Sequence, residues 1–173
     1  MLRSELSEII SNGENSGVEF KRDEIRPEQL AKEVVAFANL QGGRIFLGVE
    51  DDGTISGILR ENPQEWVLNA LRNKVHPQII PFYEEVRVGD GRTVAVVSIA
   101  SGLSKPYSVR HNNREDVYIR MGDRSEVASR EQQLRLFESG GLLHAETLPV
   151  PGAGFDQLDV DRIRFYLEHI IQD

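Results

Sequence analysis

The sequence predicts an α+β fold, in which helices pack against a mixed and mainly antiparallel sheet. Two observations lead to this prediction. Short apolar or alternating runs recur along the chain and are typical of strands, whereas several longer stretches carry apolar residues at helical spacing and are bounded by capping residues. These segments follow the order α-β-α-β-β-α-β-β-β-α, with a further helix at the end of the chain.

The first part of the chain predicts two helices and two strands. Residues 4–11 have apolar side chains at helical spacing, and the run VEFKR (18–22) alternates as a half-buried strand does. Residues 27–41 predict the second helix, because Pro27 suits a first helical position and the glycine pair that follows terminates helices. The run GRIFLGV (43–49) then predicts a buried strand.

The middle of the chain predicts two hairpins with a helix between them. The acidic turn DDG leads into TISGI, a pattern typical of a tight hairpin. Asn62 is followed three residues later by Glu65, which predicts a helix that begins with a capping box. Two strands, FYEEVRV (82–88) and RTVAVVSI (92–99), are joined by a short glycine turn and should pair in antiparallel fashion.

The later part predicts a turn at Asn112–Asn113, a strand at VYIRM (117–121) and a helix over 129–141 that Ser129 caps. We therefore expect a domain over 1–141. Proline and glycine residues mark 142–157 as a linker, and a terminal helix follows over 158–173.

The terminal helix has an apolar stripe formed by Ile163, Leu167 and Ile170, and the sequence offers it no local partner. We expect this helix to begin a further region of a longer protein, or to serve as a dimerisation element.

Composition narrows the class of protein. The 173 residues are 39% hydrophobic and 28% charged, which is ordinary for a folded domain. The absence of cysteine excludes disulfides and thiolate chemistry, and no apolar run is long enough to span a membrane. A cytoplasmic protein with no membrane partner is the expectation. The net charge of −8 argues against nonspecific coating of nucleic acid, because phosphate binding depends on lysine and arginine.

An acidic group is the first candidate site. Glu14 lies in a predicted loop, Glu19 and Lys21 share one face of the first strand, and Asp51 follows the second strand, with Asp52 next to it. If the two strands are neighbours, these carboxylates converge, and Mg²⁺ or Mn²⁺ prefers such oxygen ligands. Glu19 and Lys21 also form an E-x-K pattern, in which a lysine assists at a phosphodiester. The alternative is a solvated strand face and an ordinary acidic turn.

A basic segment is the second candidate site. Between residues 105 and 135 seven basic residues outnumber five acidic ones, although the chain as a whole is acidic. Arginines can grip phosphates and tyrosines can stack on bases, so this segment predicts nucleic-acid contact. Alternatively, its charges neutralise one another on a solvated hairpin. The candidate binding residues are Lys105, Tyr107, Arg110, Arg114, Arg120 and Arg124.

Several of these motifs occur together in a known family. The runs ENSGVEFKR, AFANLQGG, RIFLGVEDDGTISG, KPY and VYIRMGDRSEVAS, in this order, resemble the Schlafen AlbA-like domain from about Glu14 to about Phe137. The resemblance implies an α+β fold related to the archaeal chromatin protein Alba, and a DNA-binding role. It also implies a place at the head of longer transcriptional regulators or helicase-related proteins, before an ATPase-like or winged-helix region.

The resemblance extends to residues that are catalytic in one branch of the family. Schlafen endoribonucleases of animals cleave tRNA and rRNA with three acidic residues, and their spacing matches Glu14 and Glu19, with Asp51 as the best third match and Asp52 the next. By this resemblance Glu14, Glu19 and Asp51 would hold Mg²⁺ or Mn²⁺, and Lys21 would assist. Those enzymes use paired lobes, which a homodimer of this chain could supply.

The sequence therefore predicts a nucleic-acid-binding regulatory domain whose partner is DNA or RNA. Two alternatives remain open at this point: a metal-dependent endoribonuclease acting on structured RNA, and a scaffold or dimerisation domain for a downstream ATPase-like region.

Overall fold

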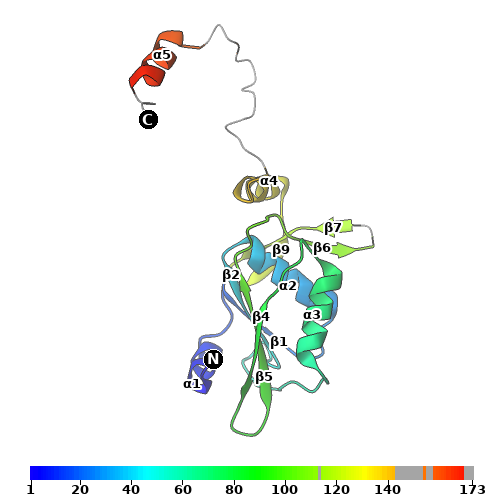
Figure 1. Cartoon of the computed structure of the whole chain (residues 1–173). Coiled ribbons are helices and arrows are strands. Elements are labelled where there is room, and N and C mark those ends of the chain that lie inside the picture. Colours follow the sequence, from blue (N-terminus) through cyan, green and yellow to red (C-terminus); the bar gives the residue numbers. More distant parts are fainter. Residues whose placement is uncertain (113, 143–153, 155–157, 170–173) are drawn as a thin grey trace. The chain divides into compact units, whose positions relative to one another are not determined.

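The computed structural model describes residues 1–112, 114–142, 154 and 158–169 (Figure 1). Two compact units are distinguished, Met1–Leu143 and His144–Asp173. Of the elements that the structure describes, the first unit contains every strand and four helices. Among the described residues of the second, a single helix is present, α5 (Val160–His169).

A four-stranded sheet forms the centre of the first unit, in the order β1-β2-β5-β4. The strands are β1 (Val18–Lys21), β2 (Gly42–Leu47), β4 (Phe82–Arg87) and β5 (Thr93–Ala100). β1 and β2 run parallel because helix α2 (Pro27–Asn39) crosses between them, and the other two pairs are antiparallel. The mixed, mainly antiparallel sheet predicted from the sequence is confirmed.

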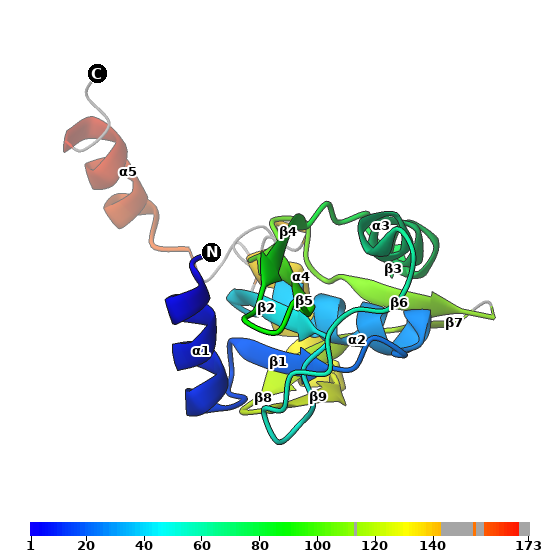
Figure 2. The same cartoon turned by 90° about the horizontal axis from the view of Figure 1, so that it is seen from below.

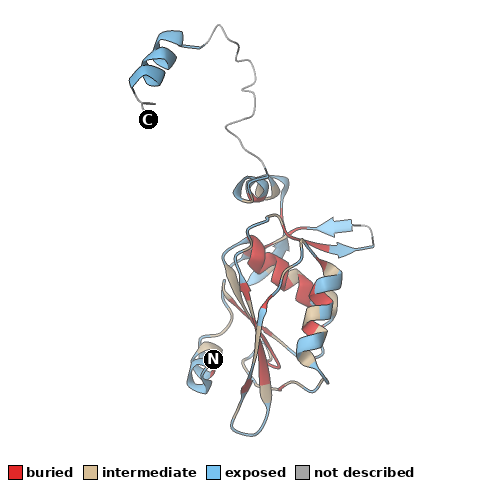
Figure 3. Ribbon diagram, in the orientation of Figure 1, coloured by how far each residue is buried: buried red, intermediate tan, exposed pale blue. Residues whose placement is uncertain are grey.

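Helices cover both faces of this sheet. α2 and α3 (Pro63–Lys74) pack on one face, where Ile45, Leu47 and Val97 belong to the larger core. α1 (Arg3–Asn12) packs on the other face through Leu6, over Phe20 and the strand residues beside it. Figures 1 and 2 show the sheet between α1 and the two other helices. In Figure 3 α2 is buried along most of its length, whereas α1 is largely exposed.

Smaller elements complete the unit. They are β3 (Val75–His76), β6 (Ser108–His111), β7 (Arg114–Asp116), β8 (Tyr118–Met121), β9 (Arg124–Val127) and α4 (Arg130–Ser139). β3, β6 and β7 form one small sheet, and β8 and β9 form a hairpin that packs on α2. Ser129 caps α4 as predicted, because its hydroxyl accepts the Gln132 backbone N–H, and the helix packs on β8 through Leu136.

Three local predictions differ from the structure. Asn62 precedes α3 in a left-handed conformation and its side chain makes no capping bond, so the predicted capping box is absent there. The DDG turn forms, but its second arm contributes only an isolated bridge between Val49 and Ile55. The strands β3, β6, β7 and β9 were not predicted, because they are short and mostly polar and show no strand periodicity.

The glycine pair after α2 has a packing role. A Cβ atom on Gly43 would lie 2.3 Å from the ring of Phe37, and Gly42 adopts a φ of 83° where the chain turns into β2. Only glycine allows the helix end and the strand to approach this closely.

Candidate acidic site and nucleic-acid surface

The loop before β1 folds back along that strand and brings Glu14 to it. Asn15 and Val18 exchange backbone hydrogen bonds, and the Asn15 side chain accepts the Gly17 N–H at 2.9 Å. Glu14 Oε1 then accepts the backbone N–H of Phe20 at 2.8 Å. A free N–H on the edge of the sheet is thereby satisfied by a carboxylate, and Glu14 is held beside Glu19 and Lys21.

Burial and the charges of other predicted acidic residues affect the pKa of Glu14. Partial burial raises the pKa of the Glu14 carboxyl, the charges of Glu19 and Asp51 raise it further, and the hydrogen bond from Phe20 opposes them. The parallel pairing of β1 and β2, with Lys21 opposite Leu47, explains why Asp51 lies within electrostatic reach.

Glu19, however, is already neutralised by two cations. Its side chain is buried, Lys21 Nζ bonds to Oε1, and Arg120 Nη1 lies 2.5 Å from Oε2. The Arg120 pair has ion-pair distance without hydrogen-bond alignment. Glu33, on α2, lies 3.3 Å from the same guanidinium nitrogen and accepts a hydrogen bond from Ser125 of β9.

Arg120 also ties the β8–β9 hairpin to the open edge of β1. Its Nη2 donates to the carbonyl oxygens of Asn15 at 2.9 Å and Val18 at 3.3 Å, and its guanidinium lies 4.9 Å from the ring of Phe37. We call Glu19, Lys21, Glu33, Arg120 and Ser125 the buried charge cluster. Burial raises the pKa of Glu33, and the nearby charge of Glu19 adds to that effect.

The acidic group does not have the arrangement of a ready metal site. Within the described part of the chain, no three Asp, Glu or His side chains are placed to hold a metal ion. Glu19 is bound to its two cations, and Asp51 is exposed. Asp52 accepts the Thr54 N–H at 2.8 Å and so stabilises the turn. As they stand, Glu14, Glu19 and Asp51 do not fit a bound Mg²⁺ or Mn²⁺.

Three residues of the predicted basic surface have structural contacts instead. Arg120 is buried in the charge cluster and cannot reach a phosphate in this conformation. Tyr107 is buried among core residues, and its backbone N–H bonds to Asn39 at 2.7 Å. Lys105 Nζ donates to the carbonyl oxygen of Leu40 at 2.8 Å, at the end of α2. Interleaving of charges and tyrosines in the sequence did not reveal which side chains face inward.

The remaining three arginines are exposed. Arg110 pairs with Glu115 across the β6–β7 hairpin, with 2.7 Å between Nη2 and Oε1. Arg114 on β7 and Arg124 on β9 form no ion pair or hydrogen bond through their side chains with any other residue that the structure describes. These two are therefore the members of the predicted set whose positive charge is available at the surface.

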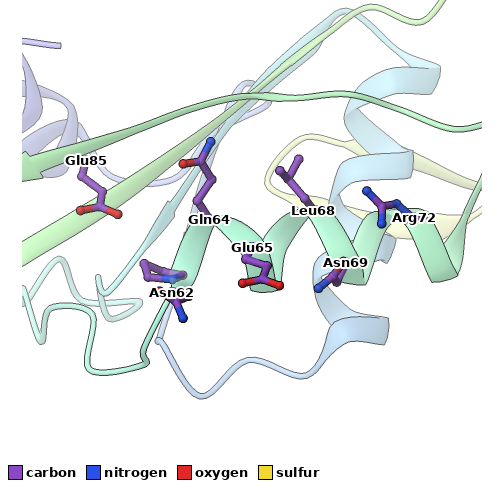
Figure 4. Close-up of a pocket in the computed structure, with 8 residues that line it drawn as sticks. Asn62, Gln64, Glu65, Leu68, Asn69, Arg72 and Glu85 are labelled. Carbon is purple, nitrogen blue, oxygen red and sulfur yellow. The ribbon is translucent and has the colours of Figure 1, made fainter.

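Among the hollows on the described surface, two are lined by several charged side chains. The larger, about 510 Å³, lies along the outer side of α3 beside Glu85 and is lined by amide and charged side chains such as Gln64, Asn69 and Arg72 (Figure 4). The smaller, about 290 Å³, lies between α2 and the β6–β7 hairpin and includes Lys32, Asp116 and Tyr118. Sequence reasoning missed Lys32, Glu33 and Asp116. Glu33 left one signal, since it lies on the apolar side of its helix between Leu30 and Phe37.

The first unit is thus an α+β domain with an acidic group beside β1 and two exposed arginines on its hairpins. A family model described as Schlafen, AlbA_2 matches residues 14–129, and the chain belongs to this family. No curated protein matches the chain.

A solved structure shares the fold. It is the solution NMR structure of the N-terminal domain of a protein from Nitrosomonas europaea, described as related to the ATP-dependent DNA helicase RecG. The two are 23% identical with a TM-score of 0.54, over 72% of this chain and 89% of that one. No helix among the described residues is both long and apolar enough to cross a membrane.

Proposed function

We propose that this chain is a nucleic-acid-binding regulatory domain that contacts phosphates through Arg114 and Arg124. The observation that carries the proposal is that these two arginines are exposed and unpaired with other described residues, whereas nearby Arg120 and Arg110 are neutralised. They lie on consecutive hairpins, since only Val117 separates β7 from β8. Family membership supports the assignment.

Titration with labelled duplex DNA, single-stranded DNA and RNA at low salt tests this proposal. Arg114→Ala with Arg124→Ala should weaken binding, because two phosphate contacts are lost. Arg87→Ala removes an exposed arginine from β4 and serves as the control for the loss of one positive charge away from the hairpins. Equal binding by the double variant and the control would contradict the proposal, and so would the absence of binding by the unaltered chain.

The context of the domain is part of the same proposal. The structural neighbour is the N-terminal domain of a helicase-related protein. By analogy we propose that this domain acts in the cytoplasm, next to a downstream ATPase-like or winged-helix region of a longer chain.

A metal-dependent endoribonuclease is the second candidate, and one observation favours it. Glu14 Oε1 accepts the backbone N–H of Phe20, which places it beside Glu19 and Lys21 on β1, so two carboxylates and a lysine lie together at the open edge of the sheet. Incubation of structured RNA with Mn²⁺ should then give cleavage that Glu14→Gln and Asp51→Asn abolish, whereas Asp123→Asn on the β8–β9 turn leaves it intact. Cleavage that persists in Glu14→Gln would rule this candidate out.

A dimerisation or scaffold role is the third candidate. It rests on α5, whose Ile163 and Leu167 are exposed, whereas Ile170 of the predicted stripe lies outside the described residues. Sizing of the chain in solution, with Ile163→Ser and Leu167→Ser for comparison, tests it. A homodimer that these changes dissociate supports the role, and a monomer at all concentrations contradicts it.

A further inference from the structure

The smaller hollow has a lining suited to one flat, polar group. It measures about 290 Å³, at the low end of the range for small-molecule pockets. The half-buried ring of Tyr118 contributes an aromatic surface, and Val109 adds an aliphatic one. Asp116 and Tyr118 both line the hollow, and burial, followed by the charge of Asp116, raises the pKa of Tyr118.

The register of the β6–β7 hairpin places its chemical groups on two distinct faces. Val109 lies opposite Asp116 and His111 lies opposite Arg114, so these four share the face that borders the hollow. Arg110 lies opposite Glu115 on the other face, where the two neutralise each other. On the face toward the hollow, the charged groups of Asp116 and Arg114 therefore remain available for a ligand.

The hollow contains both an available cation and an available acceptor. Lys32 Nζ lies 5.7 Å from the centre of the Tyr118 ring, near the outer limit of a cation–π contact, and pairs with no described carboxylate. Asp116 forms no ion pair or hydrogen bond through its side chain with another described residue, whereas Glu28, also in the lining, is tied to Lys74 at 2.7 Å.

We propose that this hollow receives one unpaired nucleobase, which stacks on Tyr118 while its exocyclic amino group donates to Asp116 and a flanking phosphate contacts Lys32 and Arg114. The inference deepens the proposed nucleic-acid binding and rests on it. Every base has a face that can stack on an aromatic ring. Cytosine and adenine carry an exocyclic amino donor that thymine lacks. Asp116 therefore favours cytosine or adenine over thymine.

The same chemistry disfavours other occupants. A small anion inside the hollow would meet the carboxylates of Asp116 and Glu28 as well as Lys32, so the charges of the lining do not favour it. A base inside a duplex is stacked on both faces and cannot enter, so the ligand is single-stranded or looped nucleic acid.

Binding of oligo-dC and oligo-dT of equal length, by the whole chain, tests the inference. The unaltered protein should bind oligo-dC roughly tenfold more tightly. Asp116→Asn should bring the two affinities together, because an amide both donates and accepts, whereas Asp123→Asn, with the same change of charge, should keep the preference. Tyr118→Leu should weaken binding of both by roughly tenfold, and Tyr118→Phe, which keeps the ring, should not.

The outcomes separate this inference from the proposed function. If the chain binds both oligomers but Tyr118→Leu or Asp116→Asn has no effect, the base site is overturned and nucleic-acid binding stands. If the chain binds neither oligomer, cytidine monophosphate is added and amide NMR shifts are followed. Shifts around Lys32 and Tyr118 then support the base site and refute polymer binding, and unchanged spectra overturn both.

Discussion

Two neighbouring regions use the same residue type in opposite ways. In the buried charge cluster Arg120 is enclosed by Glu19, Glu33 and the carbonyl groups of the β1 edge. On the two hairpins Arg114 and Arg124 are exposed, with no described partner for their guanidinium groups. The position of an arginine along these strands therefore determines whether it is buried and stabilises the fold or is exposed and can bind a polyanion.

The two regions also differ in how charge affects stability. A buried guanidinium and two carboxylates lose hydration, and their mutual attraction offsets that cost only while all partners are present. Exposed arginines remain hydrated, so their removal changes stability little.

Removal of the buried guanidinium should have the largest effect. Arg120→Leu leaves Glu19 and Glu33 buried without their shared cation and frees the β1 carbonyl groups, so the free energy of unfolding should fall by about 3–5 kcal/mol. Urea denaturation measures it. Arg124→Leu on the paired strand should change stability by less than about 0.5 kcal/mol. Similar values for the two variants would abolish the distinction between the regions.

Loss of the Ser125 hydroxyl should have a smaller effect. This group donates to Glu33 within the cluster, and its removal leaves a buried carboxylate with one partner fewer. Ser125→Ala should lower the free energy of unfolding by about 1–2 kcal/mol. Ser129→Gly provides a contrast outside the cluster, since a cap residue exchanged for glycine costs only a few tenths of a kcal/mol. A neutral Ser125→Ala would show that Glu33 does not depend on this contact.

Glu14 gives a pH-dependent test at the margin of the cluster. Its pKa is raised above the ordinary 4.5, chiefly by burial, so the folded state binds a proton that the unfolded chain releases first. The wild-type chain therefore loses stability relative to Glu14→Gln as the pH rises from about 4.5 through the higher folded pKa. Urea denaturation across this range should show that the free energy of unfolding of Glu14→Gln increases relative to that of the wild type as the pH rises. A difference between the two that does not change with pH would indicate that the pKa of Glu14 is not raised.

The exposed pair Arg110–Glu115 should contribute least. Both side chains are about half exposed, and exposed ion pairs of this kind contribute about 0.2–1 kcal/mol to the free energy of unfolding. A double-mutant cycle of Arg110→Ala and Glu115→Ala, read by thermal denaturation, should give a coupling energy below about 0.5 kcal/mol that declines with salt. A coupling comparable to the loss in Arg120→Leu would place this hairpin with the buried cluster instead.

The sequence predicted the order of most elements because their periodicity is strong. The helical stripe of α2 and the Ser129 cap of α4 depend on neighbours along the chain, and both are present in the structure. β1 forms as a strand, but its predicted alternation of buried and exposed residues is absent because Glu19 is buried as well as Val18 and Phe20. β9 and the failed Asn62 cap depend on tertiary contacts and were therefore not predicted correctly.

The candidate site was predictable in part for the same reason. The grouping of Glu14, Glu19, Lys21 and Asp51 follows from adjacent strands, which the sequence suggests. The partnership of Glu19 with Arg120 joins residues about a hundred positions apart, so no local pattern indicates it. Arg120 and Arg124 look alike in the sequence, and only the strand pairing shows that one faces α2 and the other faces outward.

The salt dependence of nucleic-acid binding tests the central claim most directly. The logarithm of the affinity should be measured against the logarithm of salt concentration for the wild type, Arg87→Ala, and the Arg114→Ala, Arg124→Ala double variant. The account predicts that the double variant lowers the slope by roughly 1.4–1.8, since each lost phosphate contact removes about 0.7–0.9, and that Arg87→Ala leaves it unchanged. A double variant with the wild-type slope and affinity would contradict the claim that these exposed arginines meet the phosphates.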